Sequence, residues 1–272
     1  MIIKMVISVV AYLILAPFVG GLLAGFDRKI SARMQGRKGP SILQPFYDVF
    51  KLFEKERITV TNVQDFYVMV FVIFVIVSGA IFFAGGDMLL VIFTLTLASA
   101  FLIIAAYSSN SPYAEVGAER ELLQMMAYEP MVLMTIIGFY MYTGSFAVRD
   151  VVTGSSMPFL PLIGIFFGFL YILTIKFRKS PFDLSMSHHA HQELVKGLTT
   201  EFAGKTLGVI EISHWYENVF LLGFVFLFFA NGTVWGYVIG VIVCLLTYFL
   251  EVLIDNCFAR MKWQDHRCRS YL

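Results

Sequence analysis

Hydrophobic residues are gathered into seven long runs along the chain, and short polar segments separate these runs. Most of the runs approach the roughly 20 residues that an α-helix needs to cross the hydrocarbon core of a bilayer. The predicted spans are 3–25, 66–84, 88–107, 121–143, 157–176, 208–230 and 234–255. Turn-forming residues separate neighbouring runs. We therefore expect an all-α integral membrane protein with about seven transmembrane helices, in which residues 1–272 form a single polytopic membrane domain.

A shorter amphipathic pattern follows the first span. From Ser41 onward, apolar residues recur at helical spacing, at Ile42, Phe46 and Phe50, with charged residues between them. Pro45 falls near the first turn, where its missing N–H does no harm. The pattern predicts a short cytoplasmic helix that lies on the membrane surface or beneath another subunit. A basic loop that binds anionic lipid is the alternative, and its length alone does not decide between the two.

The composition agrees with a membrane protein. Hydrophobic residues make up 58% of the chain and charged residues 14%, and no polar stretch is long enough for a separate soluble domain. The net charge of +1 argues against a nucleic-acid partner. Cys244, Cys257 and Cys268 lack metal-ligand spacing, so neither a disulfide framework nor a metal cluster held by this chain alone is expected. The N-terminal run indicates a retained first span rather than a cleaved signal peptide.

Basic residues are distributed unevenly between the two sides of the predicted bundle. Eighteen of the 20 Lys and Arg residues fall on one side, and only Lys4 and Arg149 fall on the other. The basic side consists of the loops 26–65, 107–120 and 176–207 and the tail 256–272. Because Lys and Arg accumulate in cytoplasmic loops, the N-terminus is expected outside and the C-terminus in the cytoplasm of a multi-pass plasma-membrane protein. A soluble partner would dock on the cytoplasmic loops.

Several carboxylates fall inside or beside predicted spans. A charge at the centre of a membrane helix costs roughly 2.5–3.5 kcal/mol, so such residues are candidates for function. Glu121 and Glu129 lie about two turns apart in one span, with Gln124 near the same face. Glu115 and Arg120 precede them at the expected cytoplasmic surface, where burial is not required.

A second acidic group begins the sixth span. Glu211, His214 and Asn218 follow one another at steps of three and four residues and therefore share a helix face, with Glu217 on an adjacent strip. Such faces could pass protons along if water fills the gaps. The alternative is that acidic groups reach for water at helix ends or hold helices together. That alternative suits Asp255, and Glu251 beside it, best.

Three ordered sequence blocks resemble the complex I subunit-1 (NuoH) family. The first contains QGRKGP at 35–40, LQP at 43–45, Asp48 and Lys51; the second contains SNSPY at 109–113, GAER at 117–120, Gln124 and Tyr128-Glu129; the third contains SPFDL at 180–184, ELV at 193–195, Gly197, Glu201-Phe202 and Gly204. Together they cover some 175 residues, which makes the signal specific, although any one block alone would be weak. The chain departs from the respiratory subunit in its SMSHHAHQ segment at 185–192 and in His214, where the family has a glutamate. These departures are more similar to the corresponding subunit of archaeal energy-converting membrane-bound hydrogenases and sulfane reductases. Family members also commonly have an eighth span.

The resemblance implies a membrane-anchor and ion-pathway subunit of a ferredoxin-linked, complex-I-like respiratory complex, without a redox centre of its own. The implied ion pathway comprises Glu121, Glu129, Asp183, Glu193, Glu201, Glu211, His214 and Glu217. The residues implied for docking of peripheral subunits are Arg28, Arg33, Arg37, Gly39, Pro40, Gln44, Pro45, Asp48, Lys51, Arg178, Pro181, Phe182, His188, His189 and His191. Antiporter-like and small membrane subunits are the further partners that it implies.

No cofactor or metal is expected on this chain; iron–sulfur clusters, and nickel–iron in a hydrogenase, would belong to partner subunits. The HHAH segment lacks the spacing of helical metal sites, which leaves a proton relay or ordinary loop histidines as its roles. Two other functions stay open at this point. One is the quinone-binding, proton-pumping subunit of respiratory complex I, and the other is a stand-alone ion or solute carrier. The sequence also leaves proton and sodium open as the transported ion.

Overall fold

The computed structural model describes residues 2–56, 62–154, 156–183, 185 and 196–258. The secondary-structure elements in this part of the chain are all helices. The α-helices are α1 (Ile2–Met34), α2 (Gln44–Glu54), α3 (Asn62–Phe83), α4 (Met88–Tyr107), α5 (Pro112–Thr143), α6 (Val148–Val152), α7 (Ile163–Lys176), α8 (Gly204–Phe229) and α9 (Val234–Cys257), and η2 (Gly197–Thr199) is a 3₁₀ helix. Among them α1, α3, α4, α5, α8 and α9 are long and apolar enough to cross a bilayer. The prediction of an all-α, multi-pass membrane protein is confirmed.

The fifth predicted span differs most from the structure. Instead of a helix over 157–176, α7 has 14 residues. At 1.5 Å per residue it is roughly 21 Å long, which is less than the hydrocarbon core of about 30 Å. Pro158 and the residues up to Leu162 precede the helix as turns. Seven full-length spans are therefore not found in the described residues, because hydropathy measures apolar length and not helical length.

Two predicted loops are partly helical. α1 continues through the polar residues 27–34, and α5 already begins at Pro112, so that residues 112–120 belong to a helix of 32 residues. Hydropathy marks only the part of a helix that lies in hydrocarbon, and a polar continuation remains helical when no breaker interrupts it. Pro112 at the start of α5 suits the first helical turn.

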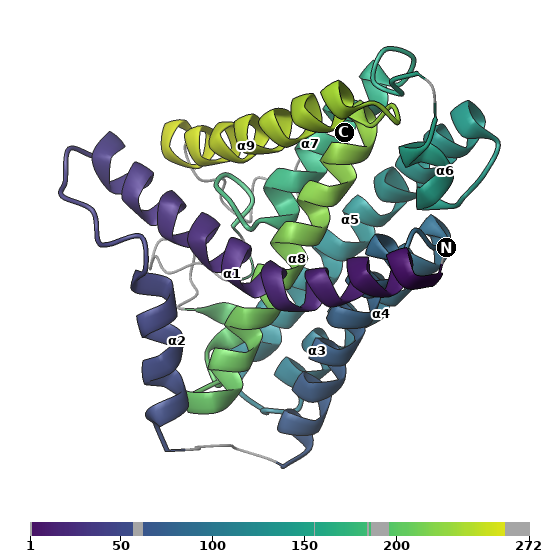
Figure 1. Ribbon diagram of the computed structural model, residues 1–272. Coiled ribbons are helices and arrows are strands. Elements are labelled where there is room, and N and C mark those ends of the chain that lie inside the picture. The colour runs from purple at the N-terminus through teal and green to yellow at the C-terminus, as the bar shows by residue number, and fades with distance from the viewer. Residues whose placement is uncertain (1, 57–61, 155, 184, 186–195, 259–272) are drawn as a thin grey trace, which may run out of the picture.

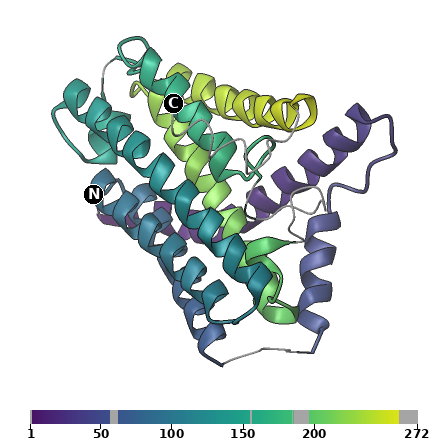
Figure 2. The same ribbon diagram turned by 180° about the vertical axis from the view of Figure 1, so that it is seen from behind.

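α8 is the central helix of the bundle. Buried residues make up 61% of its most apolar 18-residue window, compared with 22% in α1 and 28% in α9. Figures 1 and 2 show α3, α4 and α5 side by side, with α8 packed against α3, while α1 crosses one face of this group and α9 lies across one end. Phenylalanines from three helices fill the core beside α8: Phe139 from α5, Phe169 from α7, and Phe224 and Phe228 from α8 itself.

The first helix crosses α8 at very close range. A Cβ atom added to Gly20 would lie 2.5 Å from the backbone oxygen of Trp215, so only glycine permits this approach. Nearer its start, α1 places Tyr12 between α3 and α8: its ring stacks on Phe83 with the centroids 4.7 Å apart and packs edge-on against Tyr216 at 5.5 Å. Residue size at the crossing therefore sets how closely α1 packs on the bundle.

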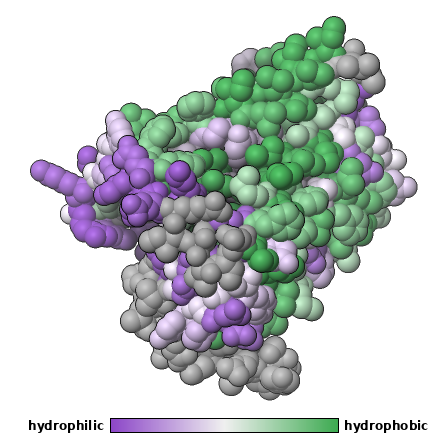
Figure 3. All heavy atoms as spheres, turned by 90° about the horizontal axis from the view of Figure 1, so that it is seen from below, coloured by the Kyte–Doolittle hydropathy of each residue, from purple (hydrophilic) through white to green (hydrophobic). Residues whose placement is uncertain are grey.

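The predicted amphipathic helix after the first span is confirmed as α2. Pro45 and Val49 are buried, and the ring of Phe46 packs edge-on against Trp215 of α8 at 5.2 Å between centroids. Phe50, which the apolar pattern includes, is instead exposed. In Figure 3 hydrophilic side chains gather at one side of the molecule, whereas a broad surface across the other side is hydrophobic.

Candidate functional site

Two cations and two carboxylates meet between α5, α8 and the end of α7. Lys176 Nζ donates to Glu217 Oε1 at 3.3 Å, and Arg178 Nη2 donates to Glu121 Oε1 at 3.2 Å. The four side chains are between 6% and 19% exposed, so both ion pairs are largely withdrawn from water. Isolated buried charges would be costly, and here each is paired. We call these four residues, together with His214, the central cluster.

His214 and Ser185 complete the polar contacts of the central cluster. Arg178 Nη1 lies 2.5 Å from His214 Nε2, and because a guanidinium only donates, Nε2 is the acceptor. The Ser185 hydroxyl donates to Oε2 of Glu121, the carboxylate oxygen that Arg178 leaves available. His214 and Glu217 of α8 thus both belong to one polar group, as the acid–imidazole face of this helix suggested. They do not contact each other directly: His214 binds Arg178, and Glu217 binds Lys176.

The charge of Arg178 is held firmly in place. Burial by itself would lower the pKa of this guanidinium, but the carboxylates of Glu121 and Glu217 raise its pKa above the ordinary value. Arg178 is therefore a permanent positive charge inside the cluster. From the sequence, Arg178 was expected on a docking surface, whereas its side chain lies with the proposed ion-pathway residues.

Two more α5 side chains border the central cluster. Lys176 Nζ lies 4.4 Å from the centroid of the Tyr128 ring, a cation–π contact. Gln124 Nε2 donates to the carbonyl oxygen of Phe182 at 2.7 Å and so fastens the segment after α7 to α5. Gln124 was expected near the face of Glu121, and the structure places both residues there.

A cavity of about 210 Å³ adjoins the central cluster. Its lining residues are Lys176, Phe177, Arg178, Asp183, His214, Glu217 and Asn218. A water molecule occupies roughly 30 Å³ in the liquid, so a polar space of this size has room for several. Chemically, the site offers carboxylates and an imidazole that water can connect, with two fixed cations between them.

A second ion-pair group joins α1 to α9. Lys179 binds Asp27 of α1 and also lies 3.6 Å from Asp255 of α9, whose Oδ1 accepts from Ser180 N at 2.9 Å. This group was not predicted from the sequence, because Asp255 was taken as a helix end that reaches for water. No local signal links Asp27 to Lys179, which lies far along the chain.

Glu251 is the other acidic residue whose burial was not predicted. It is fully buried in α9, and neither carboxylate oxygen has a hydrogen-bond partner among the residues that the structure describes. Glu251 was expected to reach for water at the end of a span or to hold helices together. Its position one turn before Asp255 in an otherwise apolar helix was the available signal.

The first loop forms a smaller electrostatic group between α1 and α2. Arg28 of α1 pairs with Asp48, which also accepts from Gln44 Nε2 at 2.9 Å. Partial burial tends to raise the pKa of Asp48, but the hydrogen bonds from Arg28 and Gln44 outweigh it and lower the pKa below the usual value. These three predicted docking residues thus hold α2 in place at the end of α1.

A cavity of about 310 Å³ opens between α1, α2 and α8. Its polar lining consists of Arg28, Asp48, Lys51, Lys55, Lys196 and Glu211. Glu211 therefore lines this cavity, whereas His214 and Asn218 line the one beside the central cluster. The helix face predicted for Glu211, His214 and Asn218 therefore borders two different cavities.

The remaining predicted residues are spread over the surface. Arg33, Arg37 and Pro40 are exposed; Gly39, Pro181, Phe182, Glu129 and Glu201 are partly buried. Glu129 has no ion pair with any described residue and lies outside the central cluster, although it shares α5 with Glu121. Glu193, His188, His189 and His191 lie outside the described residues. In those that are described, no group of three His, Cys, Asp or Glu side chains could hold a metal ion.

Arg120 is buried, contrary to the expectation from the sequence. The sequence placed it at the cytoplasmic surface, whereas it is 3% exposed in the structure. The turn η2 packs against this part of α5 so closely that a Cβ on Gly117 would lie 2.3 Å from Leu198 N. η2 therefore packs onto the part of α5 that the sequence alone places in water.

Comparisons with known proteins place the chain among membrane subunits of respiratory complexes. A family model described as NADH dehydrogenase matches residues 5–267. The chain is 30% identical over 231 residues to a subunit of the NADH-quinone oxidoreductase of Dehalococcoides mccartyi, and the match covers 78% of this chain and 65% of that protein. It is 26% identical over 286 residues to hydrogenase-4 component C of Escherichia coli, covering 95% of this chain and 89% of that protein.

One solved structure is similar over nearly the whole chain. A chain of the membrane-bound sulfane sulfur reductase, an archaeal respiratory membrane complex, matches with a TM-score of 0.85 and 28% sequence identity. The match covers 98% of this chain and 94% of that chain.

Proposed function

The chain belongs to the NADH dehydrogenase family, and we propose that it is the membrane-anchor and ion-pathway subunit of a ferredoxin-linked, complex-I-like respiratory complex, either a membrane-bound hydrogenase or a sulfane reductase. The resemblance carried by the three sequence blocks is confirmed at the level of the family. Relatives in a hydrogenase and in a sulfane sulfur reductase complex support the assembly with other subunits. In this role the chain docks the peripheral redox module and relays protonation changes toward antiporter-like subunits.

The central cluster carries this proposal. Lys176, Arg178, Glu121 and Glu217 form a buried group whose charges balance. A redox event in a neighbouring subunit can shift the protonation of its carboxylates. Moving one proton onto Glu121 or Glu217 would leave its cation unpaired in a low-dielectric site, which strongly couples the two ion pairs. His214, in contact with Arg178, extends the group along α8. Purely structural ion pairs would not need a cavity with room for several water molecules beside them.

The docking surface that we propose is the loop between α1 and α2 together with the segment after α7. Both lie on the side that holds 18 of the 20 Lys and Arg residues, so we propose that this side is cytoplasmic and that the N-terminus is outside. Iron–sulfur clusters, and nickel–iron in a hydrogenase, would lie in the subunits that dock there. Gln124, which fastens Phe182 to α5, would connect a docked subunit to the central cluster.

A quinone-binding role is the second candidate, because a cavity exists between α1, α2 and α8. Sites for an apolar ring are lined mainly by hydrophobic and aromatic side chains. Apolar residues such as Val49, Leu52 and Trp215 do line this cavity. They are accompanied by four cations, Arg28, Lys51, Lys55 and Lys196, and by the carboxylates of Asp48 and Glu211. Burying an apolar ring against six charged side chains would cost their hydration, which favours the ferredoxin-linked proposal.

The test is made in the assembled complex with Glu121→Gln and Glu217→Gln, which keep the shape of each side chain and remove its charge. We expect ion pumping into vesicles to fall at least about tenfold, the effect of losing roughly 1.4 kcal/mol of coupling, while electron transfer to a soluble acceptor survives. Glu129→Gln and Glu211→Gln test the outer parts of the proposed pathway in the same assay.

Glu119→Gln is the matched control, because Glu119 is exposed on the same helix, two residues from Glu121. It should pump normally. Unchanged pumping in both Glu121→Gln and Glu217→Gln, with all subunits present in the purified complex, would remove the central cluster from the pathway. Ion flux through this chain alone in liposomes, without a redox donor, would instead indicate a stand-alone carrier.

A further inference from the structure

A large cavity lies at the end of the bundle opposite the basic loops. It measures about 710 Å³ and is bordered by the start of α1, the end of α3, α6 and the end of α8. Its lining includes Lys4, Ser8, Phe82, Arg149, Thr153 and Phe226. Nothing in the proposed ion pathway uses this cavity.

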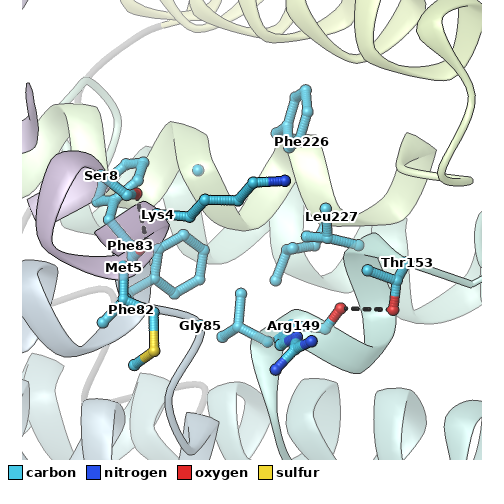
Figure 4. A pocket seen from close by; sticks show the side chains of 14 residues that line it. Lys4, Met5, Ser8, Phe82, Phe83, Gly85, Arg149, Thr153, Phe226 and Leu227 are labelled. Atoms are coloured by element: carbon cyan, nitrogen blue, oxygen red, sulfur yellow. Dashed lines mark hydrogen bonds between the residues drawn. The ribbon is translucent and has the colours of Figure 1, made fainter. Parts of the chain in front are cut away.

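Two basic side chains distinguish this cavity from an ordinary gap between helices. The span assignment leaves only Lys4 and Arg149 on this side of the bundle, and the structure brings both into one cavity. Figure 4 shows Lys4 reaching across the cavity from α1, while Arg149 lies at another wall beside Gly85. Both residues are exposed, so their charged groups are accessible from outside the bundle.

The walls between the two cations are apolar and firmly held. Phe82, Phe83, Phe226 and Leu227 are among the apolar residues that line it. The polar groups at the rim are largely satisfied internally, since Ser8 Oγ donates to Phe83 O at 2.6 Å and Thr153 Oγ1 donates to Arg149 O at 3.0 Å. A fully hydrated anion would gain little from such walls.

The wall that carries Arg149 is built by backbone pairing. Val148 N donates to Gly86 O and Met88 N donates to Phe146 O, each at 2.9 Å, which ties the α3–α4 turn to the segment before α6. Asp87 accepts from Leu89 N as the cap of α4 and does not line the cavity. The lining therefore contains two cations and no carboxylate.

Outside the cavity, α1 continues as an apolar surface. Ile3, Val6, Ile7 and Val10 are exposed large hydrophobic residues, in position to contact a hydrocarbon chain that leaves the cavity along this helix. An occupant that matches all these features has an anionic head and an apolar tail. Basic pockets between membrane helices bind phospholipid head groups for the same electrostatic reason.

We propose that this cavity binds one anionic phospholipid, with its phosphate between Lys4 and Arg149 and an acyl chain against Phe82, Phe226 and the outer face of α1. The lipid would seal the junction of α1, α3, α6 and α8 at this end of the bundle. A free phosphate lacks the apolar part that the walls require. A helix from another subunit would need an acidic residue of its own to match the positive charge of this lining.

The purified complex tests this inference by native mass spectrometry in detergent, with added dioleoylphosphatidylglycerol as the probe. Because each basic residue near a membrane surface contributes about fivefold in affinity, the double variant Lys4→Gln/Arg149→Gln should bind this lipid about thirtyfold more weakly. The charge-conserving variant Lys4→Arg/Arg149→Lys should retain binding. Lys205→Gln, which changes an exposed lysine on the basic side of the bundle, is the matched control.

Two further arms identify the occupant. Dioleoylphosphatidylcholine and inorganic phosphate should each compete poorly with phosphatidylglycerol, and a photo-crosslinking amino acid in place of Met5 should yield an adduct with lipid. Equal phosphatidylglycerol binding by the double variant would overturn the site. Equal competition by inorganic phosphate, or a Met5 crosslink to a protein subunit, would overturn the lipid as its occupant.

Discussion

Tyr216 donates a hydrogen bond of 2.7 Å from its hydroxyl to the carbonyl oxygen of Leu13. Pro17 follows Leu13 by four residues inside α1, and because proline has no N–H, the carbonyl of Leu13 lacks its helical donor. A side chain of α8 therefore supplies the hydrogen bond that Pro17 removes from α1. The contact lies at the crossing where Gly20 admits the backbone of Trp215.

Tyr216→Phe is expected to destabilise the α1–α8 crossing. The substitution keeps the ring and leaves the Leu13 carbonyl without a donor, which costs about 1–2 kcal/mol of unfolding free energy. The measurement is thermal or denaturant unfolding of the purified protein in detergent. Tyr237→Phe is the control, since no hydrogen bond from its hydroxyl is found within the described residues.

Pro17→Ala provides the decisive comparison. Restoring an N–H at position 17 gives Leu13 its helical donor, so Tyr216→Phe should cost less than about half as much in the Pro17→Ala protein. Equal losses with and without Pro17 would show that the Tyr216 hydroxyl does not act through this carbonyl.

The sequence predicted the membrane class and the residues on α8, but not how the central cluster is assembled. His214 and Glu217 share a helix, so their spacing alone placed them near each other. Arg178 follows the end of α7 with a φ of 52°, a left-handed conformation that non-glycine residues adopt rarely. No local pattern signals that this turn directs its guanidinium toward Glu121, 57 residues earlier.

Helix geometry explains why the side chains of Glu121 and Glu129 do not share a site. At 3.6 residues per turn, eight residues miss two whole turns by about 80°, so the two side chains point in clearly different directions. Glu121 faces Arg178, whereas Glu129 lies outside the central cluster. The burial of Arg120 likewise depends on tertiary packing, here of η2 against α5. The sequence around η2 has no periodic pattern from which this packing could be predicted.

The Lys176–Glu217 pair predicts a marked asymmetry between single and double substitutions. Glu217→Leu leaves Lys176 as an unpaired buried cation and should lower the unfolding free energy by about 3–5 kcal/mol. Lys176→Met combined with Glu217→Leu removes both charges and should recover most of that loss. Unfolding in detergent measures both variants. A double variant as unstable as Glu217→Leu would argue that the loss does not come from leaving the Lys176 charge unpaired.

The Arg28–Asp48 pair predicts a small, pH-dependent stabilisation. The pKa of Asp48 is lowered in the folded protein, so the contribution is complete above the unfolded value of about 3.9 and is lost as the pH falls through the lower folded value. Because the two side chains are 46% and 42% exposed, the expected size is below about 1 kcal/mol. Arg28→Gln should therefore be less stable than the parent at neutral pH, and the difference should fade below about pH 4.

Unfolding measured between about pH 3 and 7 checks this, with Arg33→Gln as the control for removing a nearby exposed cation. A difference between Arg28→Gln and the parent that persists unchanged at the acidic end would mean that Arg28 stabilises α2 through contacts other than Asp48.

Glu251 predicts that one substitution makes the protein more stable. Its carboxyl group is fully buried, and neither oxygen is hydrogen-bonded to any part of the chain that the structure describes. Such burial costs about 1–3 kcal/mol, so Glu251→Met, which keeps the length of the side chain and removes the polar group, should raise the unfolding free energy by a similar amount. Glu251→Gln retains the unpaired polar atoms and should show no such gain. If Glu251→Met instead unfolds more readily than Glu251→Gln, the carboxylate must have a stabilising partner in the native protein, such as bound water or an ion.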